Sequence, residues 1–256
     1  KKDGRLEPPK TYPVGKVEIV DVEPVSFPDF LREKDNALWE YYMSIRGNDP
    51  LPDIFHRRLW DLYSIYLTVG GMPEVVASHL SEGDPARVRK LQQDLVQLYE
   101  NDIVKYNGEI DAAKILAVLR SVVPQLAKEN SKFIYGALRE GARGRGYEEA
   151  IDIGMLKIAA GITDESLILD ADFPFKGRFV ENYVLQQLAG KTVGPVHYWA
   201  ERADREIDFV IQHGDNAVPV EVKAGGDKRA SSFKGYVNSR KPKFAIRFSE
   251  RNLKKD

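Results

Sequence analysis

Two acidic residues and a lysine near the C-terminal end have the types and spacing of a divalent-metal site. Asp208 lies in the β-rich run 207–211, and Glu221 and Lys223 lie two residues apart in the next run, 218–223. Two carboxylates a few ångströms apart repel each other, and a bound divalent cation relieves that repulsion. Mg²⁺ takes one or two carboxylates and keeps its other positions for water and phosphate oxygens. A lysine beside it could orient an attacking water or stabilise charge developing on a phosphate.

The two runs are predicted to pair as a hairpin whose turn is His213 to Asn216. Side chains alternate across a strand, so a slip of one residue moves each of them to the other face. If Asp208 lies opposite Glu221, one face is wholly apolar and consists of Ile207, Phe209, Ile211, Val218, Val220 and Val222. The other face gathers Glu206, Asp208, Glu221 and Lys223. Burial of the apolar face selects this register and therefore predicts a cluster of charges. Taken alone, Glu-x-Lys on a strand is more often the solvated side of a sheet with weak ion pairs.

The composition is that of a globular protein with room for two domains or one large one. Of 256 residues, 43% are apolar and 30% are charged, which argues against disorder. The absence of cysteine excludes disulfides and thiolate metal sites and fits a reducing compartment. No apolar run approaches the roughly 20 residues that span a bilayer, and the N-terminus lacks the apolar core of a signal peptide. We therefore expect a cytoplasmic protein with no membrane partner. The net charge of −1 gives no global nucleic-acid signal, so DNA binding would need local basic patches.

Helical patterns fill most of the chain before the hairpin. Ser26 before Asp29 is a capping pattern, and a strand-like run at 16–22 precedes it. Apolar residues at helical spacing predict helices at 55–67, where Gly70 and Gly71 stop the helix, and from about 85 to 106. Lys176 to Leu188 is predicted to form a helix with Glu181 among its apolar residues. The aromatic residues of the first helices could form a partner surface, but their helical spacing favours burial: Tyr41, Tyr42, Trp60, Tyr63 and Tyr66.

Residues 113–151 contain three short helical patterns, the third beginning at Tyr147, with a glycine-containing turn at 141–146. Arg139, Arg143 and Arg145 lie in or beside this turn, and Lys132 lies near the start of the second pattern. Short helices of this kind resemble a helix-turn-helix or winged-helix unit, in which these side chains would bind nucleic acid. A plain helical bundle with solvated arginines explains the same pattern equally well.

Several blocks in order resemble one known family. They are Pro13-Val14-Gly15-Lys16-Val17, Pro24-Val25-Ser26-Phe27, Gly70-Gly71-Met72-Pro73-Glu74-Val75-Val76, Tyr99-Glu100-Asn101-Asp102-Ile103-Val104-Lys105-Tyr106, Lys176-Gly177-Arg178-Phe179-Val180-Glu181-Asn182, Tyr198-Trp199, Glu206-Ile207-Asp208-Phe209-Val210-Ile211 and Pro219-Val220-Glu221-Val222-Lys223-Ala224-Gly225. The chain resembles the part after the ATPase core of prokaryotic P-loop, AAA-like ATPases that end in a restriction-endonuclease-like domain of unknown function.

The resemblance implies an α/β protein of four parts. Residues 1–45 would be the tail of the ATPase core and a linker, 46–112 a helical region, 113–152 an incomplete winged-helix-like unit, and 153–256 a restriction-endonuclease-like α/β/α domain. It also implies that Glu181, Asp208, Glu221 and Lys223 match the family's acidic and lysine positions. Kinship of fold does not by itself imply activity.

The chain departs from the family pattern in two places. It contains no Gly-x-x-x-x-Gly-Lys-Ser/Thr segment, so ATP would be bound only through a P-loop that is absent from this chain. The run around Asp152 and Ile153 is shorter than in the family, which predicts an omitted segment at that junction.

The leading hypothesis is a DNA-directed accessory domain of an ATPase with a Mg²⁺-dependent phosphodiesterase site. Asp208 and Glu221 would hold Mg²⁺, Lys223 would assist the nucleophilic water, and Glu181 would supply a further carboxylate. The alternative is a non-catalytic module that binds DNA or a protein and regulates the ATPase core. Pairing of Lys223 with Glu206 or Glu221 would favour this alternative.

Overall fold

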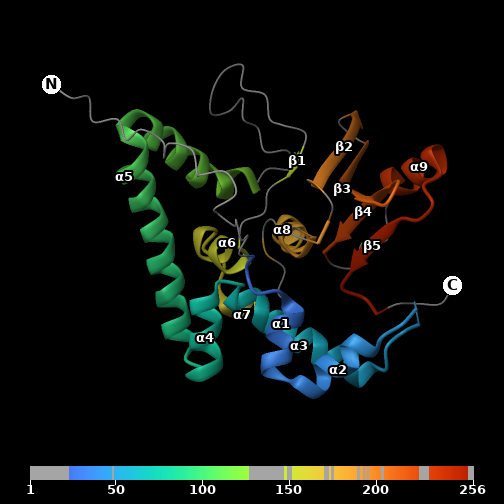
Figure 1. Ribbon diagram of the computed structural model, residues 1–256, viewed down its shortest axis with the longest axis horizontal. Coiled ribbons are helices and arrows are strands. Elements are labelled where there is room, and N and C mark those ends of the chain that lie inside the picture. Colours follow the sequence, from blue (N-terminus) through green and yellow to red (C-terminus); the bar gives the residue numbers. More distant parts are fainter. Residues whose placement is uncertain are drawn as a thin grey trace, which may run out of the picture.

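The computed structural model describes residues 23–47, 49–126, 147–148, 152–169, 173, 176–188, 191–192, 194, 196–202, 205–224 and 231–252. Apart from the two-residue strand β1, a helical region comes first in the chain and a mixed β-sheet follows, with one helix, α8, between them (Figure 1). The prediction of an α/β protein with a helical region ahead of the hairpin is confirmed. The predicted strand at 16–22 lies outside the described residues.

The helical region consists of α1 (Phe27–Lys34), α2 (Asn36–Ser44), α3 (Asp53–Val69), α4 (Pro73–Ser81), α5 (Pro85–Leu126), α6 (Ile153–Ala159) and α7 (Asp164–Ile168). Ser26 caps α1 and accepts the backbone N–H of Asp29, as predicted. Gly70 ends α3 with a φ of 78°, a conformation that glycine adopts without strain. Across the part of the chain that the structure describes, no helix has both the length and the apolarity needed to cross a membrane.

The aromatic residues of the first helices pack into one core, as their spacing predicted. Tyr66 and Phe30 are fully buried, and the Tyr66 hydroxyl donates a hydrogen bond of 2.7 Å to the carbonyl oxygen of Val25. The rings of Tyr41 and Phe55 stack with their centroids 3.8 Å apart. Burial therefore explains these side chains, and the partner-surface reading is not needed. Helices α6 and α7 contribute to the same core through Ile153, Leu156 and Leu167.

Two local predictions between residues 106 and 151 are wrong. The helix expected to end near Tyr106 continues as α5 to Leu126, across residue 112, so the first short helix expected after Ala113 is part of α5. Tyr147 and Glu148 form the strand β1 (Tyr147–Glu148) and not the start of a helix. They pair antiparallel with His197 and Val196, and this distant strand decides their conformation.

The junction at Asp152 and Ile153, where the sequence predicted an omitted segment, is continuous. Asp152 is the N-cap of α6, and its carbonyl oxygen accepts the N–H of Leu156 at 2.9 Å, the normal helical spacing. The helix cap at Asp152 does not test whether the sequence omits a segment here, so the omission stays a prediction.

The sheet has the order β1-β2-β3-β4-β5. The strands β2 (Val196–Arg202), β3 (Arg205–His213) and β4 (Asn216–Lys223) are antiparallel neighbours, and β5 (Ile246–Ser249) runs parallel to β4. The β3–β4 hairpin turns at Gly214 and Asp215, within the predicted turn. Helix α9 (Ser231–Arg240) contacts β3 and β4.

Helix α8 (Lys176–Leu188) has the predicted bounds and belongs to two cores. Phe179 packs with the helical region, whereas Val184 and Leu185 pack with the sheet residues Phe209 and Val220. Tyr183 contacts both cores. The sequence predicts an apolar helix, but only the packing shows that it joins the helical region to the sheet.

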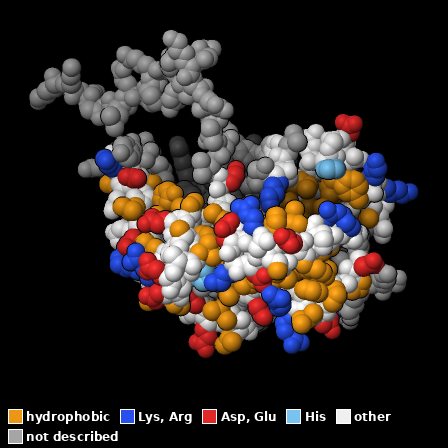
Figure 2. All heavy atoms as spheres, turned by 60° about the horizontal axis from the view of Figure 1, so that its bottom comes forward, with side chains coloured by type: hydrophobic (Ala, Val, Ile, Leu, Met, Phe, Trp, Pro, Cys, Tyr) orange, Lys and Arg blue, Asp and Glu red, His pale blue; other side chains and the backbone are white. Residues whose placement is uncertain are grey.

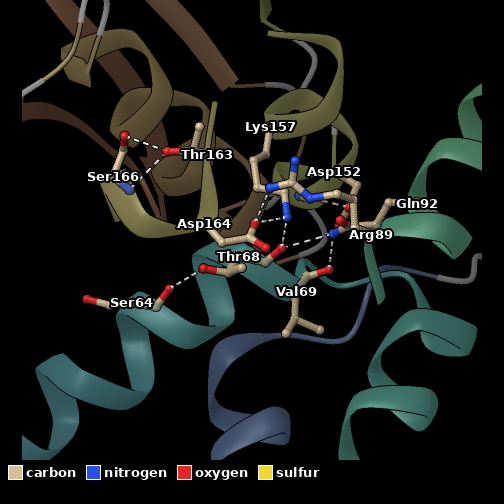
Figure 3. Close-up of polar contacts among 11 residues, drawn as sticks. Ser64, Thr68, Val69, Arg89, Gln92, Asp152, Lys157, Thr163, Asp164 and Ser166 are labelled. Carbon is tan, nitrogen blue, oxygen red and sulfur yellow. Dashed lines mark hydrogen bonds and ion pairs between the residues drawn. The ribbon is translucent and has the colours of Figure 1, made fainter. Parts of the chain in front are cut away.

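Buried polar groups tie the helices of the helical region to one another and to α8. Figure 3 shows those around α3, α5, α6 and α7. The Asp152 carboxylate accepts the N–H of Gly71 at 2.7 Å, and the Gln186 side chain of α8 accepts the N–H of Ile153 at 2.9 Å. Lys157 is fully buried and donates to the carbonyl oxygen of Thr68 and to Asp164, both at 2.7 Å. Gln92 donates to the carbonyl oxygens of Thr68 and Val69. The last carbonyls of α3, which lack partners within the helix, are thereby satisfied.

Candidate metal centre

The centre lies at one end of the β3–β4 hairpin. The strands pair from His213 opposite Asn216, next to the turn, to Phe209 opposite Val220. This is the predicted register. Beyond Phe209, the Asp208 carboxylate accepts the backbone N–H of Val222 at 2.7 Å. The Asp208 side chain therefore bonds to the neighbouring strand at the end of the ladder and holds its carboxylate against β4.

The predicted apolar face is buried, and along β4 the residues 218–222 are buried on both faces. On the apolar face, Ile211 is half-buried and the remaining five side chains are buried: Ile207, Phe209, Val218, Val220 and Val222. On the other face Glu221 is only 4% exposed, so this is not the solvated side of a sheet. Burial of a carboxylate is unfavourable unless a partner compensates for the lost water.

Lys223 supplies that partner. Its Nζ lies 2.6 Å from Oε1 of Glu221, two residues back along β4. The Lys223 side chain keeps 27% of its surface exposed, so the pair reaches toward solvent from a buried carboxylate. This is the pairing that the sequence analysis named as favouring a non-catalytic module.

Helix α8 brings a third carboxylate to the hairpin. Glu181 pairs with Arg178, three residues earlier on the same helix, and the two side chains are 18% and 26% exposed. Glu181 and Asp208 lie close enough for the charge of Asp208 to disfavour the ionised form of Glu181. The charges of three carboxylates, from α8, β3 and β4, therefore influence one another at this end of the hairpin.

The surroundings shift the acidities of these groups. Burial, and then the charge of Asp208, raise the pKa of Glu181 to about 8, against the opposing effects of Arg178 and Lys223. Burial, and then the charge of Glu221, raise the pKa of Asp208 to about 6. The pKa of Lys223 is also raised, since its hydrogen bond to Glu221 and the three acidic charges outweigh burial. Shifts of this kind are common at functional sites, where burial and neighbouring like charges tune the acidity of reactive groups.

The oxygen-only donor set suits a hard cation such as Mg²⁺, for which two carboxylates suffice. Asp208 and Glu221 come from adjacent strands and would be the ligands. Within the described ranges, no three His, Cys, Asp or Glu side chains form a ready group of metal ligands. An ion here would therefore need water or phosphate oxygens in its remaining positions, and Glu221 would have to give up part of its bond to Lys223.

Arg178 is the member of the centre that the sequence analysis missed. Its spacing of three residues from Glu181 on a predicted helix was a usable signal, because such side chains face each other. Glu206, expected on the charged face, is half-exposed.

The four predicted nucleic-acid-binding residues lie outside the described residues: Lys132, Arg139, Arg143 and Arg145. On the face drawn in Figure 2, the basic side chains of the described residues are interspersed with acidic ones and do not form a single-sign patch.

Two protein families match parts of the chain. Residues 176–256 match a domain of unknown function (DUF4143), and residues 61–153 match another (DUF8612). DUF4143 commonly accompanies AAA ATPases in prokaryotic proteins. The first match begins at the first residue of α8 and contains the whole centre, whereas the second ends at Ile153, the first residue of α6. No curated protein matches the chain, and no solved structure does so either.

Proposed function

We propose that this chain is part of an AAA-like ATPase-family protein and that its last domain is a DNA-directed module of the restriction-endonuclease type with a Mg²⁺-dependent phosphodiesterase site. One observation carries the proposal: three carboxylates from three elements gather beside a lysine although two of them have raised pKa values. An arrangement that disfavours its own ionised groups is explained if a divalent cation relieves it.

In this proposal each residue has one task. Asp208 and Glu221 hold the cation, and the bond from Val222 keeps the Asp208 carboxylate turned toward β4. The cation would acidify a bound water and neutralise charge on the scissile phosphate. Lys223 orients that water or stabilises the developing charge. Glu181 supplies a further carboxylate, which would help to hold the cation or accept a proton from the water.

Calorimetric titration with Mg²⁺ and Mn²⁺ tests the cation site. The wild-type chain is compared with Asp208→Asn and Glu221→Gln, which keep the shape of each side chain and remove its charge. Glu206→Gln is the matched control, because it removes a neighbouring half-exposed charge of the same strand. We expect binding to be lost in the first two variants and kept in the control. Absence of binding in the wild-type chain at millimolar metal, with and without short duplex DNA, would contradict the site.

A cleavage assay separates catalysis from binding. With Mn²⁺ and labelled single- and double-stranded DNA, we expect the wild-type chain to cut and Lys223→Met not to cut, while Lys223→Met still binds the metal. Metal binding without cleavage of any DNA would support the cation site and contradict the nuclease function.

The ATPase context supplies the second part of the proposal. The chain has no P-loop, so an ATPase core elsewhere in the same protein would bind the nucleotide. The usual association of DUF4143 with AAA ATPases supports this arrangement. Co-purification of this chain with an ATPase core expressed separately would test it, and failure of the two to associate would count against a direct contact.

The Lys223–Glu221 ion pair favours a second candidate, a non-catalytic DNA- or protein-binding module that regulates the ATPase core. In that case the lysine permanently neutralises a buried carboxylate, and the centre is structural. Lys223→Met distinguishes the two. A structural pair predicts a loss of several kcal/mol of stability on leaving Glu221 buried and unpaired, and addition of Mg²⁺ would not restore it.

A further inference from the structure

Arg178 and Glu181 form an ion pair near the start of α8, beside the hairpin end that carries Asp208, Glu221 and Lys223. The pair differs from an ordinary helical pair in its surroundings. Arg32 and Asp29 have the same spacing on α1, 3.8 Å apart, but both are about half exposed. Arg178 and Glu181 keep only 26% and 18% of their surface, so less water screens their interaction.

The influence of Arg178 extends beyond its own partner. Its charge also lowers the pKa of Asp208 on β3, against the larger effects of burial and Glu221. Lys223 acts on the same carboxylates from β4. The centre thus holds three carboxylates and two positively charged side chains, with a formal charge of −1 when all are ionised. Both positive side chains stabilise the ionised carboxylates.

A guanidinium in this position and a divalent cation would compete for the same carboxylate. The other four ionised side chains present Arg178 with a charge of −2, and a bound divalent ion brings this charge to zero. Arg178 thus loses its net attraction to the centre, and its direct interaction with the ion is repulsive. The charge facing Arg178 becomes more positive in either case, from −2 to zero if Glu181 is already ionised, and from −1 to zero if Glu181 loses a proton when the ion binds. Removal of the Arg178 charge must therefore favour the ion.

We propose that Arg178 is a built-in competitor of the divalent cation. It occupies Glu181 in the resting centre, and Glu181 can help to hold the ion only after Arg178 releases it. This inference rests on the proposed cation site. Arg178 is a positioning residue here, since it acts through Glu181. Displacement by a divalent ion changes the formal charge of the five side chains plus the ion from −1 to +1. The freed guanidinium then suits an anionic phosphodiester, whose oxygens it can contact in pairs.

Calorimetry with Mn²⁺ on the whole chain tests the competition. We expect Arg178→Gln to bind Mn²⁺ about 5- to 10-fold more tightly than the wild-type chain, since a like charge a few ångströms away contributes an interaction of this size when partly screened. Arg178→Lys keeps the charge and should bind within about 2-fold of wild type on the same argument. Arg32→Gln, which removes the exposed pair of α1, is the control and should change nothing.

Three results would overturn the inference. Equal or weaker binding by Arg178→Gln, with binding by the wild-type chain intact, would refute the competition and leave the proposed cation site standing. If Arg178→Lys bound Mn²⁺ as tightly as Arg178→Gln does, the charge of Arg178 would not be the cause of the tighter binding. Absence of binding by all variants would refute the cation site, and the inference with it.

A measurement on the wild-type chain covers the case in which Arg178→Gln does not fold. The side-chain Nε–H signal of Arg178 in an NMR spectrum should shift as Mg²⁺ is added, in proportion to the bound fraction. A signal that stays unchanged while Mg²⁺ binds would show that Arg178 keeps its partner and would overturn the proposal.

Discussion

The carboxylate of Asp208 accepts the backbone N–H of Val222 at the end of the β3–β4 ladder. One side chain thus has two tasks, because it completes the hydrogen bonding of the sheet and brings a charge to the candidate metal centre. The amide oxygen of asparagine can perform the first task but not the second.

Asp208→Asn should therefore separate stability from cation binding. The variant keeps an acceptor for Val222 and removes the repulsion from Glu221, so its free energy of unfolding should equal or exceed that of wild type. Asp208→Ala leaves the N–H without an acceptor and should be destabilised by about 1–3 kcal/mol. Both should lose Mg²⁺ binding. Urea denaturation and calorimetry measure the two properties, and equal destabilisation of both variants would show that the charge itself supports the fold.

Cation affinity should rise steeply with pH. The pKa of Glu181 is raised to about 8 and that of Asp208 to about 6, so protons compete with the ion as the pH falls through these values. We expect Mn²⁺ to bind more tightly at pH 8 than at pH 6, by on the order of 10-fold or more. Calorimetry in buffers of different ionisation enthalpy should also show proton release on binding. An affinity that is flat over this range would contradict the raised pKa values.

His79 should make the helical core sensitive to acid. Burial, and then the charge of Lys34, lower the pKa of His79, whose ring lies 5.8 Å from that of Phe30. The folded state thus binds the proton less readily than the unfolded state, so stability is fully present above about pH 6.5, the ordinary value for histidine, and is lost as the pH falls below it. Thermal unfolding between pH 5 and 7 should show this slope. The dependence of stability on pH should be weaker in His79→Gln. If it is unchanged, titratable groups other than His79 cause it.

Two glycines should respond to alanine in opposite directions. A Cβ on Gly71 would lie 2.7 Å from the carbonyl oxygen of Val25 and 2.8 Å from Cβ of Pro24, so Gly71→Ala should destabilise the chain by about 1–3 kcal/mol. Gly235 lies in α9 with nothing within 4 Å of a Cβ, and Gly235→Ala should stabilise by about 0.5–1 kcal/mol. Chemical denaturation measures both. A neutral Gly71→Ala would show that the backbone at Pro24 and Val25, ahead of α1, can shift.

The hairpin was predictable because its information is local. Alternation of Ile207, Asp208 and Phe209 against Val220, Glu221 and Val222 admits one register that buries an apolar face, and the structure has that register. The bounds of α8 and the end of α3 at Gly70 were predictable for the same reason.

Features that depend on distant segments were not predictable. Tyr147 and Glu148 are extended because β2, about fifty residues later in the chain, supplies their partners. Lys157 looks like a solvated lysine in the sequence, but it is buried because a carbonyl of α3 and the side chain of Asp164 receive its ammonium group. The spacing of Arg178 and Glu181 on one helix predicts their ion pair. The effect of the Arg178 charge on Asp208 depends on the packing of α8 on the sheet, which the sequence does not show.

The two packed faces of α8 determine where this chain can be divided. A fragment that begins at residue 176 would keep the centre but expose the side of α8 that carries Phe179 and Tyr183. Such a fragment would display a hydrophobic stripe to solvent and tend to self-associate. A fragment that ends before α8 would uncover the opposing aromatic surface around Tyr63 and Tyr66, whose rings lie against Tyr183. The shared helix thus makes the two halves a single piece for expression and for any movement transmitted to the centre.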